Sequence, residues 1–522
     1  MEGKRLKYPI GQQDFAGIIR DGWLYIDKTG LIYRLVNNDK YIFLSRPRRF
    51  GKSLLLSTIR YYFEGRKELF EDLQIMELEK HWKKHPVLHL ELSGTMPGDP
   101  DSLKSVLDFQ FREWEKRYDI ENISKSLSQR FATIIREACI KTGERVVVLI
   151  DEYDNPLINT IHLKETYESN RELLKSVYSN LKSMDEFIRF AMLTGVSRFS
   201  NTTVFSGLNN LRDISFDNDY STICGFTAEE IRRKMWDGVE RLAGYEECSP
   251  EEAMVLLKDE YDGYHFSEIM ADIYNPFSLL NCLASSRIDN YWIQSGVPEF
   301  LVRRLKETPI SYQKLFSASG TSESLTASDA AFDSPVALFY QTGYLTIKGY
   351  DRKTRRFRLG IPNKEVDEGL FNYLLKGYYS YNVLDAEDRL KEMTACLEKG
   401  EPESFLERLK ETLAGIPYHL HGKMTELDFE RTLFVIFHIM GYHIHCELAT
   451  SAGRIDLTVA TGDYLYIIEL KLDKSAEEAL EQIERKAYAL QWKNDGRKIF
   501  KIGVNFSSET RNIADWKILE QD

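Results

Sequence analysis

Apolar positions in the first part of the chain fall into short runs separated by longer amphipathic stretches. Tyr41–Leu44 and Arg145–Ile150 are almost continuously apolar, as expected of strands buried on both faces of a sheet. Pro86–Ser93 alternates apolar and polar residues, and Arg189–Thr194 is a further apolar run. Because strands alternate with helical periodicity, the pattern predicts an α/β fold around a parallel sheet.

The first strand leads into a predicted phosphate-binding loop. Ser45–Phe50 is followed by Gly51-Lys52-Ser53 and a Leu-rich helical segment. In this order, backbone N–H groups hold phosphates, Lys52 reaches the β/γ oxygens and the Ser53 hydroxyl ligates Mg²⁺. The first glycine position of G-x-x-x-x-G-K-S is Arg46 here, although glycine suits the tight turn and the close approach of backbone to phosphate. On these residues alone, an ordinary loop remains an alternative.

The octapeptide RPRRFGKS, residues 46–53, resembles the signature of a bacterial AAA-ATPase-like family whose own loop carries Arg at that position. Pro9-Ile10-Gly11, Asp14-Phe15 and Tyr25–Thr29 extend the resemblance, which covers about the first 220 residues. It implies a P-loop NTPase fold that binds ATP with Mg²⁺. The nucleotide-binding candidates in the loop are Arg46, Arg48, Arg49, Gly51, Lys52 and Ser53.

The second buried strand ends in two carboxylates, Asp151 and Glu152, as a Walker B strand does. We expect Asp151 to hold the Mg²⁺ water shell and Glu152 to polarise the attacking water. The following Tyr153–Pro156 continues the family pattern IDEYDNPL. The alternative is a core strand that ends in a solvated acidic turn.

Polar residues also follow the apolar run that ends at Thr194. Thr194 and Ser197 are candidate sensors of the γ-phosphate or of water, and Arg198 is a candidate charge-stabilising arginine. The alternative is that they cap the strand and begin a turn.

The middle of the chain, residues 226–420, reads as helical, and its aromatic blocks resemble the post-ATPase region of the same family, a lid or winged-helix-like module. Aromatic side chains at this spacing favour core packing over base stacking. Ala337–Ile347 and Phe357–Ile361 predict a small β-element, and Tyr373–Pro417 predicts two or three helices. The expected domains are 1–225, 226–420 and 421–522.

The last part of the chain predicts an α-β-β-β-α unit. A helix over Thr425–Gly441 contains Glu430, and a helix over Ser475–Gln491 contains Gln482. The strands between them are His443–Leu448, one that begins at Gly453–Leu457, and Tyr464–Leu472. We therefore expect a small C-terminal α/β domain.

Period-two alternation places Glu469 and Lys471 on one face of their strand. Charges inside a sheet are costly unless they are paired, metal-bound or catalytic. Asp456, in a hairpin partner strand, brings a second carboxylate beside Glu469. Two carboxylates and the Leu470 carbonyl suit Mg²⁺ or Mn²⁺, and Lys471 is placed to orient water or neutralise charge during attack on a phosphodiester.

Asp456 followed by Glu469-x-Lys471 resembles the PD-(D/E)XK nuclease superfamily, although Ile455 replaces its proline. The resemblance covers about residues 417–517 and implies a restriction-endonuclease-like fold. Glu430 matches the acidic residue of the first helix, a further metal ligand, and Gln482 matches a catalytic-site Gln on the later helix. The alternative is a structural salt bridge on a nuclease fold that has lost activity.

Charge and cysteine usage narrow the function class. The 522 residues carry a net charge of −12, which excludes a polycation built for nonspecific nucleic-acid binding. Residues 425–522 carry 12 Lys and Arg against 17 Asp and Glu, which disfavours backbone binding, although a basic strip over Lys486–Lys501 partly compensates. The six cysteines form no C-x-x-C, which suits a reducing cytosol. His443, His445 and Cys446 lack a second pair of zinc ligands and are expected to be ordinary strand residues.

With no apolar run of transmembrane length, we expect a cytoplasmic protein with no membrane partner. Two functions of different class remain. The first is an ATPase module that controls a Mg²⁺-dependent nuclease of mobile-element or phage-defence type, with DNA favoured and RNA as the other nucleic-acid candidate. The second is a nucleotide-dependent switch or scaffold whose nuclease fold does not cleave. A homo-oligomer is compatible with either.

Overall fold

The computed structural model describes residues 6–96, 99–121, 124, 126–197, 210–294, 301, 304–305, 308, 310–326, 334–378, 383–414, 425–441, 444–450, 453–492 and 496–521. The chain divides into two compact units. Residues 1–295 with 318–366 form the first unit, and residues 296–317 with 367–522 form the second. The predicted middle region, 226–420, is therefore shared between the two.

The apolar runs of the first unit form one five-stranded parallel sheet with the order β2-β3-β4-β1-β5. The strands are β1 (Tyr41–Ser45), β2 (Val87–Glu91), β3 (Val146–Asp151), β4 (Ile188–Gly195) and β5 (Arg212–Asp213). The α/β prediction is confirmed. Because β4 lies between β1 and β3, its carboxyl end lies between the Gly-Lys-Ser loop and the Asp-Glu pair, all at the same edge of the sheet.

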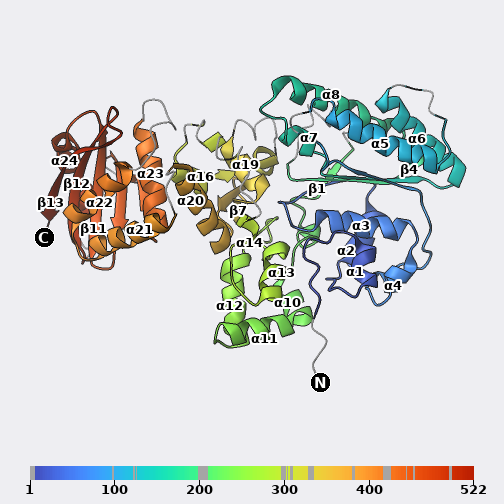
Figure 1. Cartoon of the computed structure of the whole chain (residues 1–522), viewed down its shortest axis with the longest axis horizontal. Helices are drawn as coiled ribbons and strands as arrows, with labels where there is room; N and C mark the ends of the chain where they lie inside the picture. The colour runs from blue at the N-terminus through green and yellow to red at the C-terminus, as the bar shows by residue number, and fades with distance from the viewer. Residues whose placement is uncertain are drawn as a thin grey trace. The chain divides into compact units, whose positions relative to one another are not determined.

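Helices cover both faces of this sheet (Figure 1). One face is covered by α5 (Ser102–Arg117), α6 (Leu127–Thr142) and α8 (Lys164–Tyr178), whose apolar stripes share a core with the strands. The remaining elements of the ATPase-like part are α1 (Phe15–Arg20), α2 (Thr29–Asn38), α3 (Lys52–Phe63), η1 (Lys67–Leu69), α4 (Ile75–Leu78), α7 (Asn155–Ile158), α9 (Asn180–Ser183), η2 (Asp185–Phe187) and η3 (Asn218–Tyr220).

The first unit continues with a group of short helices and a small sheet. The helices are α10 (Ala228–Lys234), α11 (Trp236–Tyr245), α12 (Pro250–Tyr261), α13 (Pro276–Ser285), α14 (Tyr291–Gln294), α17 (Ser322–Thr326) and α19 (Pro335–Thr342). The sheet has the order β6-β8-β7, with β6 (Ser319–Gly320), β7 (Thr346–Asp351) and β8 (Arg356–Gly360). Part of the predicted β-element is thus the helix α19, which Pro335 begins and Gly343, at φ +91°, ends.

The second unit is built around a mixed sheet with the order β13-β12-β11-β10-β9. Its strands are β9 (Ile444–Thr450), β10 (Gly453–Ala460), β11 (Tyr464–Leu472), β12 (Lys498–Ser507) and β13 (Asn512–Gln521). Its helices are α16 (Tyr312–Phe316), most of α20 (Lys364–Tyr378), α21 (Val383–Glu398), α22 (Pro402–Ala414), α23 (Glu426–Ile439), α24 (Ala476–Arg485) and η5 (Tyr488–Trp492). The predicted helix over Ser475–Gln491 is interrupted at Ala487, which has φ +48°.

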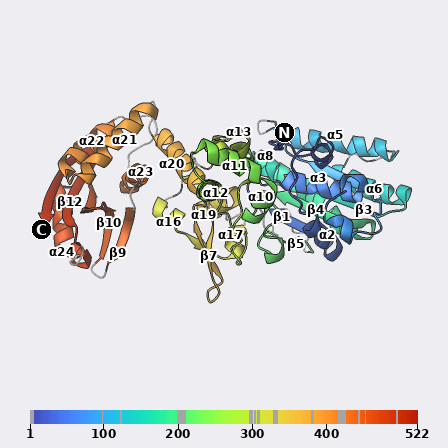
Figure 2. The same ribbon diagram turned by 90° about the horizontal axis from the view of Figure 1, so that it is seen from below.

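Alternation along β11 sends its side chains to different helices. The Tyr466 hydroxyl donates to the Leu397 carbonyl of α21 at 2.6 Å, whereas Ile467 packs with Ile483 of α24. Figure 2 shows α21 and α22 on one side of this sheet and α24 on the other. Glu469 and Lys471 lie on the same face of β11 as Ile467, which is the face that α24 covers. No helix in the described ranges has the length and apolar character needed to span a membrane.

Candidate functional site

The Gly-Lys-Ser loop connects β1 to α3. Gly51 has φ +88°, a left-handed conformation that favours glycine, and Lys52 is the first residue of the helix. The Lys52 Nζ donates to the carbonyls of Arg46 and Pro47, each at 2.9 Å. Burial lowers the pKa of Lys52, and the charge of Asp151 opposes that shift. The lysine therefore bridges the loop from inside.

The Arg46 side chain fastens the loop to the segment after β5. Its Nη1 donates to the carbonyls of Ser45 and Ser215, each at 2.9 Å, and Nη2 donates to the Tyr220 carbonyl at 3.3 Å. The guanidinium also lies 4.1 Å from the ring centroid of Phe266. Arg46 is 2% exposed and does not line the cavity described below. Its predicted contact with nucleotide stays a prediction that no contact supports.

Aromatic residues of the region after residue 226 contact the same loop. Phe50 packs on Tyr264 and Phe266, with ring centroids 4.8 and 5.5 Å apart, and the Trp292 Nε1 donates to the Arg48 carbonyl at 3.2 Å. The buried aromatic blocks at Tyr264 and Trp292 therefore act as core under the loop. Sequence reasoning did not connect them to it.

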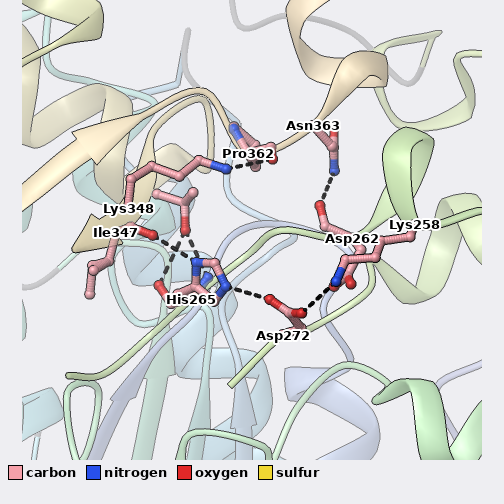
Figure 3. A network of polar contacts seen from close by, with 9 residues as sticks. Lys258, Asp262, His265, Asp272, Ile347, Lys348, Pro362 and Asn363 are labelled. Atoms are coloured by element: carbon pink, nitrogen blue, oxygen red, sulfur yellow. Dashed lines mark hydrogen bonds and ion pairs between the residues drawn. The ribbon is translucent and has the colours of Figure 1, made fainter. Parts of the chain in front are cut away.

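A polar network holds His265, which lies between Tyr264 and Phe266 in the chain (Figure 3). Its Nδ1 lies 2.7 Å from the Ile347 carbonyl oxygen, and its Nε2 lies 2.7 Å from Asp272 Oδ1. Lys258 donates to the other oxygen of Asp272 at 3.0 Å. The network ties α12, the loop after it and β7 together behind the aromatic residues that contact Phe50.

The Asp-Glu pair lies beside the predicted sensor. Thr194, at the end of β4, donates to Asp151 Oδ1 at 2.6 Å. Asp151 is 3% exposed, and Glu152 follows it with φ +50°. Burial raises the pKa of Glu152, an effect that the nearby charge of Lys52 reduces. The structure thus brings Asp151, Glu152, Thr194 and Lys52 together, as the sequence predicted.

Asp154 is a functional candidate that sequence reasoning missed. Its Oδ2 accepts hydrogen bonds from the Val196 and Ser197 amides at 2.9 and 2.6 Å and from the Ser197 hydroxyl at 2.8 Å. Burial raises the pKa of Asp154. The signal was its place in the IDEYDNPL segment. Ser197 therefore contacts Asp154, whereas Arg198 lies outside the described residues.

One cavity of about 450 Å³ is lined by Lys52, Glu152 and Asp154, whereas Asp151 and Thr194 are not among its lining residues. The loop and two acidic residues contribute polar groups to its lining, and the N-terminal segment and α13 contribute apolar side chains. The lining includes Pro9, Ile10, Leu24, Ile26, Arg48, Arg49, Gly51, Lys52, Ser53, Glu152, Asp154, Phe226, Phe277 and Leu280. A cavity of this size, lined by both polar and apolar groups, suits a nucleotide.

The second unit brings together the predicted nuclease residues. The register of β10 with β11 places Asp456 opposite Glu469, and the Leu470 amide donates to Asp456 Oδ2 at 2.9 Å. The Lys471 Nζ donates to Glu469 Oε1 at 2.9 Å, and the Gln482 Nε2 donates to the same oxygen. Four positions predicted from spacing therefore converge.

Glu469 is the most buried of these residues, with 1% of its side chain exposed. Its Oε2 is buried and has no hydrogen-bond partner in the described structure. Burial, together with the charge of Asp456, raises the pKa of Glu469 to about 7. A buried carboxylate oxygen without a donor, beside a second carboxylate, fits a hard divalent cation.

The comparisons with known proteins agree with both domain assignments. Residues 9–205 match the family described as "Predicted AAA-ATPase", and residues 424–516 match the "PD-(D/E)XK nuclease superfamily". A protein of Azotobacter chroococcum mcd 1, named "Uncharacterized protein in vnfD 5'region", is 34% identical over 529 residues, covering 98% of this chain and 99% of that protein. This chain belongs to the AAA-ATPase-like family with a C-terminal PD-(D/E)XK domain. The recognition made from the sequence is confirmed.

Glu430 does not join the nuclease residues in a metal-binding group. Among the described residues, no three or more His, Cys, Asp or Glu side chains gather as such a group. Glu430 is on α23, whose Phe429 packs on Phe506 with ring centroids 4.2 Å apart. Phe506 pairs with Leu472 and so lies on the face away from Glu469. The role of Glu430 as a metal ligand stays a prediction.

Two cations of the basic strip predicted for the nuclease domain are paired with carboxylates. Lys501 Nζ lies 2.6 Å from Glu484, and Lys498 is paired with Glu520. Of the zinc candidates, His443 and the side chains of His445 and Cys446 lie outside the described residues.

Proposed function

We propose that the protein binds and hydrolyses ATP in the first unit and that this activity controls a Mg²⁺-dependent nuclease in the second unit, with DNA favoured and RNA as the other candidate substrate. The convergence of Asp456, Glu469, Lys471 and Gln482 around one buried carboxylate oxygen carries the proposal. A buried carboxylate oxygen without a hydrogen-bond partner, such as Glu469 Oε2, costs folding free energy, so a purely structural role does not explain it.

In the ATP site, Lys52 exchanges its two carbonyl partners for the β/γ-phosphate oxygens, while Arg48 and Arg49 add positive charge at the mouth of the loop. Ser53 and Asp151 would hold Mg²⁺, which would supply positive charge to offset the charge that develops on the phosphate. Thr194 orients Asp151, and Glu152 positions the attacking water. ATP is the nucleotide that the family resemblance favours.

In the nuclease site, Asp456 and Glu469 would hold Mg²⁺ or Mn²⁺, which supplies an activated water and a Lewis acid when bound. Lys471 places its ammonium beside Glu469, where it stabilises charge that grows on the attacked phosphate. Gln482 fixes the rotamer of Glu469 from α24.

Cleavage of labelled single- and double-stranded DNA and RNA, in Mg²⁺ or Mn²⁺ and with or without ATP, tests the proposal. We expect metal-dependent cleavage that ATP changes and that EDTA stops. Cleavage that persists in EDTA contradicts the metal site.

A second function, a nucleotide-dependent switch or scaffold whose nuclease fold only binds, is favoured by the acidic charge of residues 425–522 and by the ion pairs of Lys498 and Lys501. ATP binding without cleavage of any tested nucleic acid would support this function instead.

A further inference from the structure

A strongly basic β-hairpin projects from the first unit and contains none of the residues of the two sites described above. It is formed by β7 and β8, and Figure 2 shows it extending beyond its neighbours. From Lys348 to Arg358 it carries six Lys and Arg side chains but a single carboxylate, Asp351. The hairpin is therefore positively charged, whereas the whole chain has a net charge of −12.

The turn of the hairpin is internally braced. Asp351 pairs with Arg356 in the β-register, and its carboxylate accepts the Lys353 amide at 2.9 Å and the Thr354 hydroxyl at 2.8 Å. Arg355 adopts φ +54°. The only acidic residue of the hairpin is therefore engaged in shaping the turn, which holds the adjacent cations outward.

The arginines of β8 are held in place on the exposed face of the sheet. Arg356 donates to the Ser319 carbonyl at 2.7 Å. The Arg358 guanidinium lies across Gly349, where a Cβ would come within 2.5 Å of Nη2, so a side chain at position 349 would displace the guanidinium. Phe357, between the two arginines, is buried.

The cations of the tip are free. Arg352, Lys353 and Arg355 are exposed, and none of them forms an ion pair with any residue in the described ranges. In the nuclease domain, Lys471, Lys498, Lys501 and Lys517 each face a carboxylate, whereas Lys474 and Arg485 are exposed and form no ion pair within the described ranges. The hairpin tip thus gathers three unpaired cations within residues 352–355, whereas Lys471, the cation beside the predicted catalytic carboxylates, is paired with Glu469.

A hollow of about 430 Å³ lies at the base of the hairpin. Its lining combines three aromatic side chains, one arginine, two carboxylates and three neutral polar residues: Phe216, Tyr350, Phe357, Arg355, Glu268, Glu323, Asn218, Thr321 and Ser322. Tyr350 and Phe357 lie with ring centroids 4.7 Å apart. Aromatic faces next to an arginine suit an unpaired nucleobase, whereas a lipid headgroup or an acidic peptide needs only the charge.

We propose that the β7–β8 hairpin binds the phosphodiester backbone of a nucleic acid through Arg352, Lys353 and Arg355, with the hollow at its base accepting an unpaired base. This inference rests on the proposed action on nucleic acid and adds an element that supplies affinity which the acidic nuclease domain lacks. Three phosphate contacts on a single strand contribute a slope of about −2 to the dependence of log K on log salt.

Fluorescence anisotropy with the full chain tests the hairpin without catalysis. Labelled single-stranded DNA, single-stranded RNA and duplex DNA are titrated in EDTA, and the first two separate the two sources of the phosphodiester. The variant Arg352→Gln/Lys353→Gln/Arg355→Gln is compared with Lys104→Gln/Lys116→Gln/Arg117→Gln, which removes the same charge from the exposed surface of α5. We expect about tenfold weaker single-strand binding and a salt slope smaller by about 2 for the hairpin variant alone.

Equal affinity and slope in the two variants, or no binding of any nucleic acid by the parent chain, would overturn the proposal. Tighter binding to duplex than to single strand overturns the base-binding part. Loss of binding to phosphatidylserine vesicles without any nucleic-acid binding would assign the hairpin to a membrane instead. ATP binding and cleavage are measured separately on the same variant, so a failed nuclease proposal remains distinguishable from a failed hairpin.

Discussion

The two candidate sites differ in how their charged groups are satisfied. In the ATPase-like unit, Lys52 is bonded to two loop carbonyls, and Asp151 accepts from Thr194. In the nuclease-like unit, Glu469 accepts from Lys471 and Gln482 through one oxygen, and its other oxygen is buried without a partner. In the first site Lys52 and Asp151 are hydrogen-bonded within the protein. In the second site one oxygen of Glu469 is buried without a hydrogen bond, which is unfavourable for folding.

This difference predicts different consequences of ligand binding. A phosphate must compete with two hydrogen bonds of Lys52, so nucleotide affinity depends on how the loop exchanges partners. A divalent cation at Glu469 lowers the free-energy cost of the buried carboxylate charge, and it displaces no hydrogen bond from Oε2. Loss of Lys52 should therefore weaken nucleotide binding at the first site, whereas loss of a carboxylate at the second should remove metal binding and cleavage together.

The largest effect is expected from Asp456→Ala. Removing one of two carboxylates deletes a metal ligand, so cleavage should fall by more than about 10³-fold while ATP affinity stays unchanged. Calorimetric titration with Mn²⁺ measures the loss of the metal ligand, and a cleavage assay measures the loss of activity. Titration with ATP checks that the ATP affinity is unchanged. Asp463→Ala, in the exposed turn between β10 and β11, is the matched control. Wild-type cleavage by Asp456→Ala would disprove the site.

Lys471→Ala separates metal binding from catalysis. The ammonium acts mainly on charge that develops in the transition state, so cleavage should fall by about 10²–10³-fold with little change in Mn²⁺ affinity. The exposed Lys474→Ala tests whether loss of any nearby lysine has the same effect. A parallel loss of Mn²⁺ binding would instead make Lys471 a structural partner of Glu469.

Lys52→Ala tests the internally satisfied site. Loss of the β/γ contact should weaken ATP binding by at least about tenfold, or about 1.4 kcal/mol, and leave the nuclease metal site unaffected. Equilibrium binding of a fluorescent ATP analogue provides the measurement, with Lys67→Ala on the exposed η1 turn as the control. Unchanged affinity in Lys52→Ala would remove the P-loop assignment.

The smallest effect is expected from single changes at the mouth of the loop. Arg48 and Arg49 are exposed, and the Arg49 guanidinium lies 4.9 Å from the ring centroid of Phe277. Arg48→Ala and Arg49→Ala should each slow ATP hydrolysis only a few-fold, because exposed charges are screened. Activity per chain should not depend on protein concentration. A steep rise with concentration, with both variants active, would place the arginine finger on another chain.

The sequence by itself determined the parts that depend on local order. Buried strands that end in Gly51-Lys52-Ser53 and in Asp151-Glu152 must meet at one edge of a parallel sheet, and the spacing from Asp456 to Glu469 fits a two-stranded hairpin. Side-chain alternation then placed Glu469 and Lys471 together. These features needed no knowledge of distant contacts.

Only the tertiary structure decided the features that join distant segments. It turned Arg46 into an anchor on Ser215 and Tyr220, and it set Phe50 on Tyr264 and Phe266. It also added β12 and β13 to the nuclease sheet. The local sequence around an arginine such as Arg46 is the same whether its guanidinium binds a phosphate or backbone carbonyls. The partner is determined by which distant segments of the chain pack beside it.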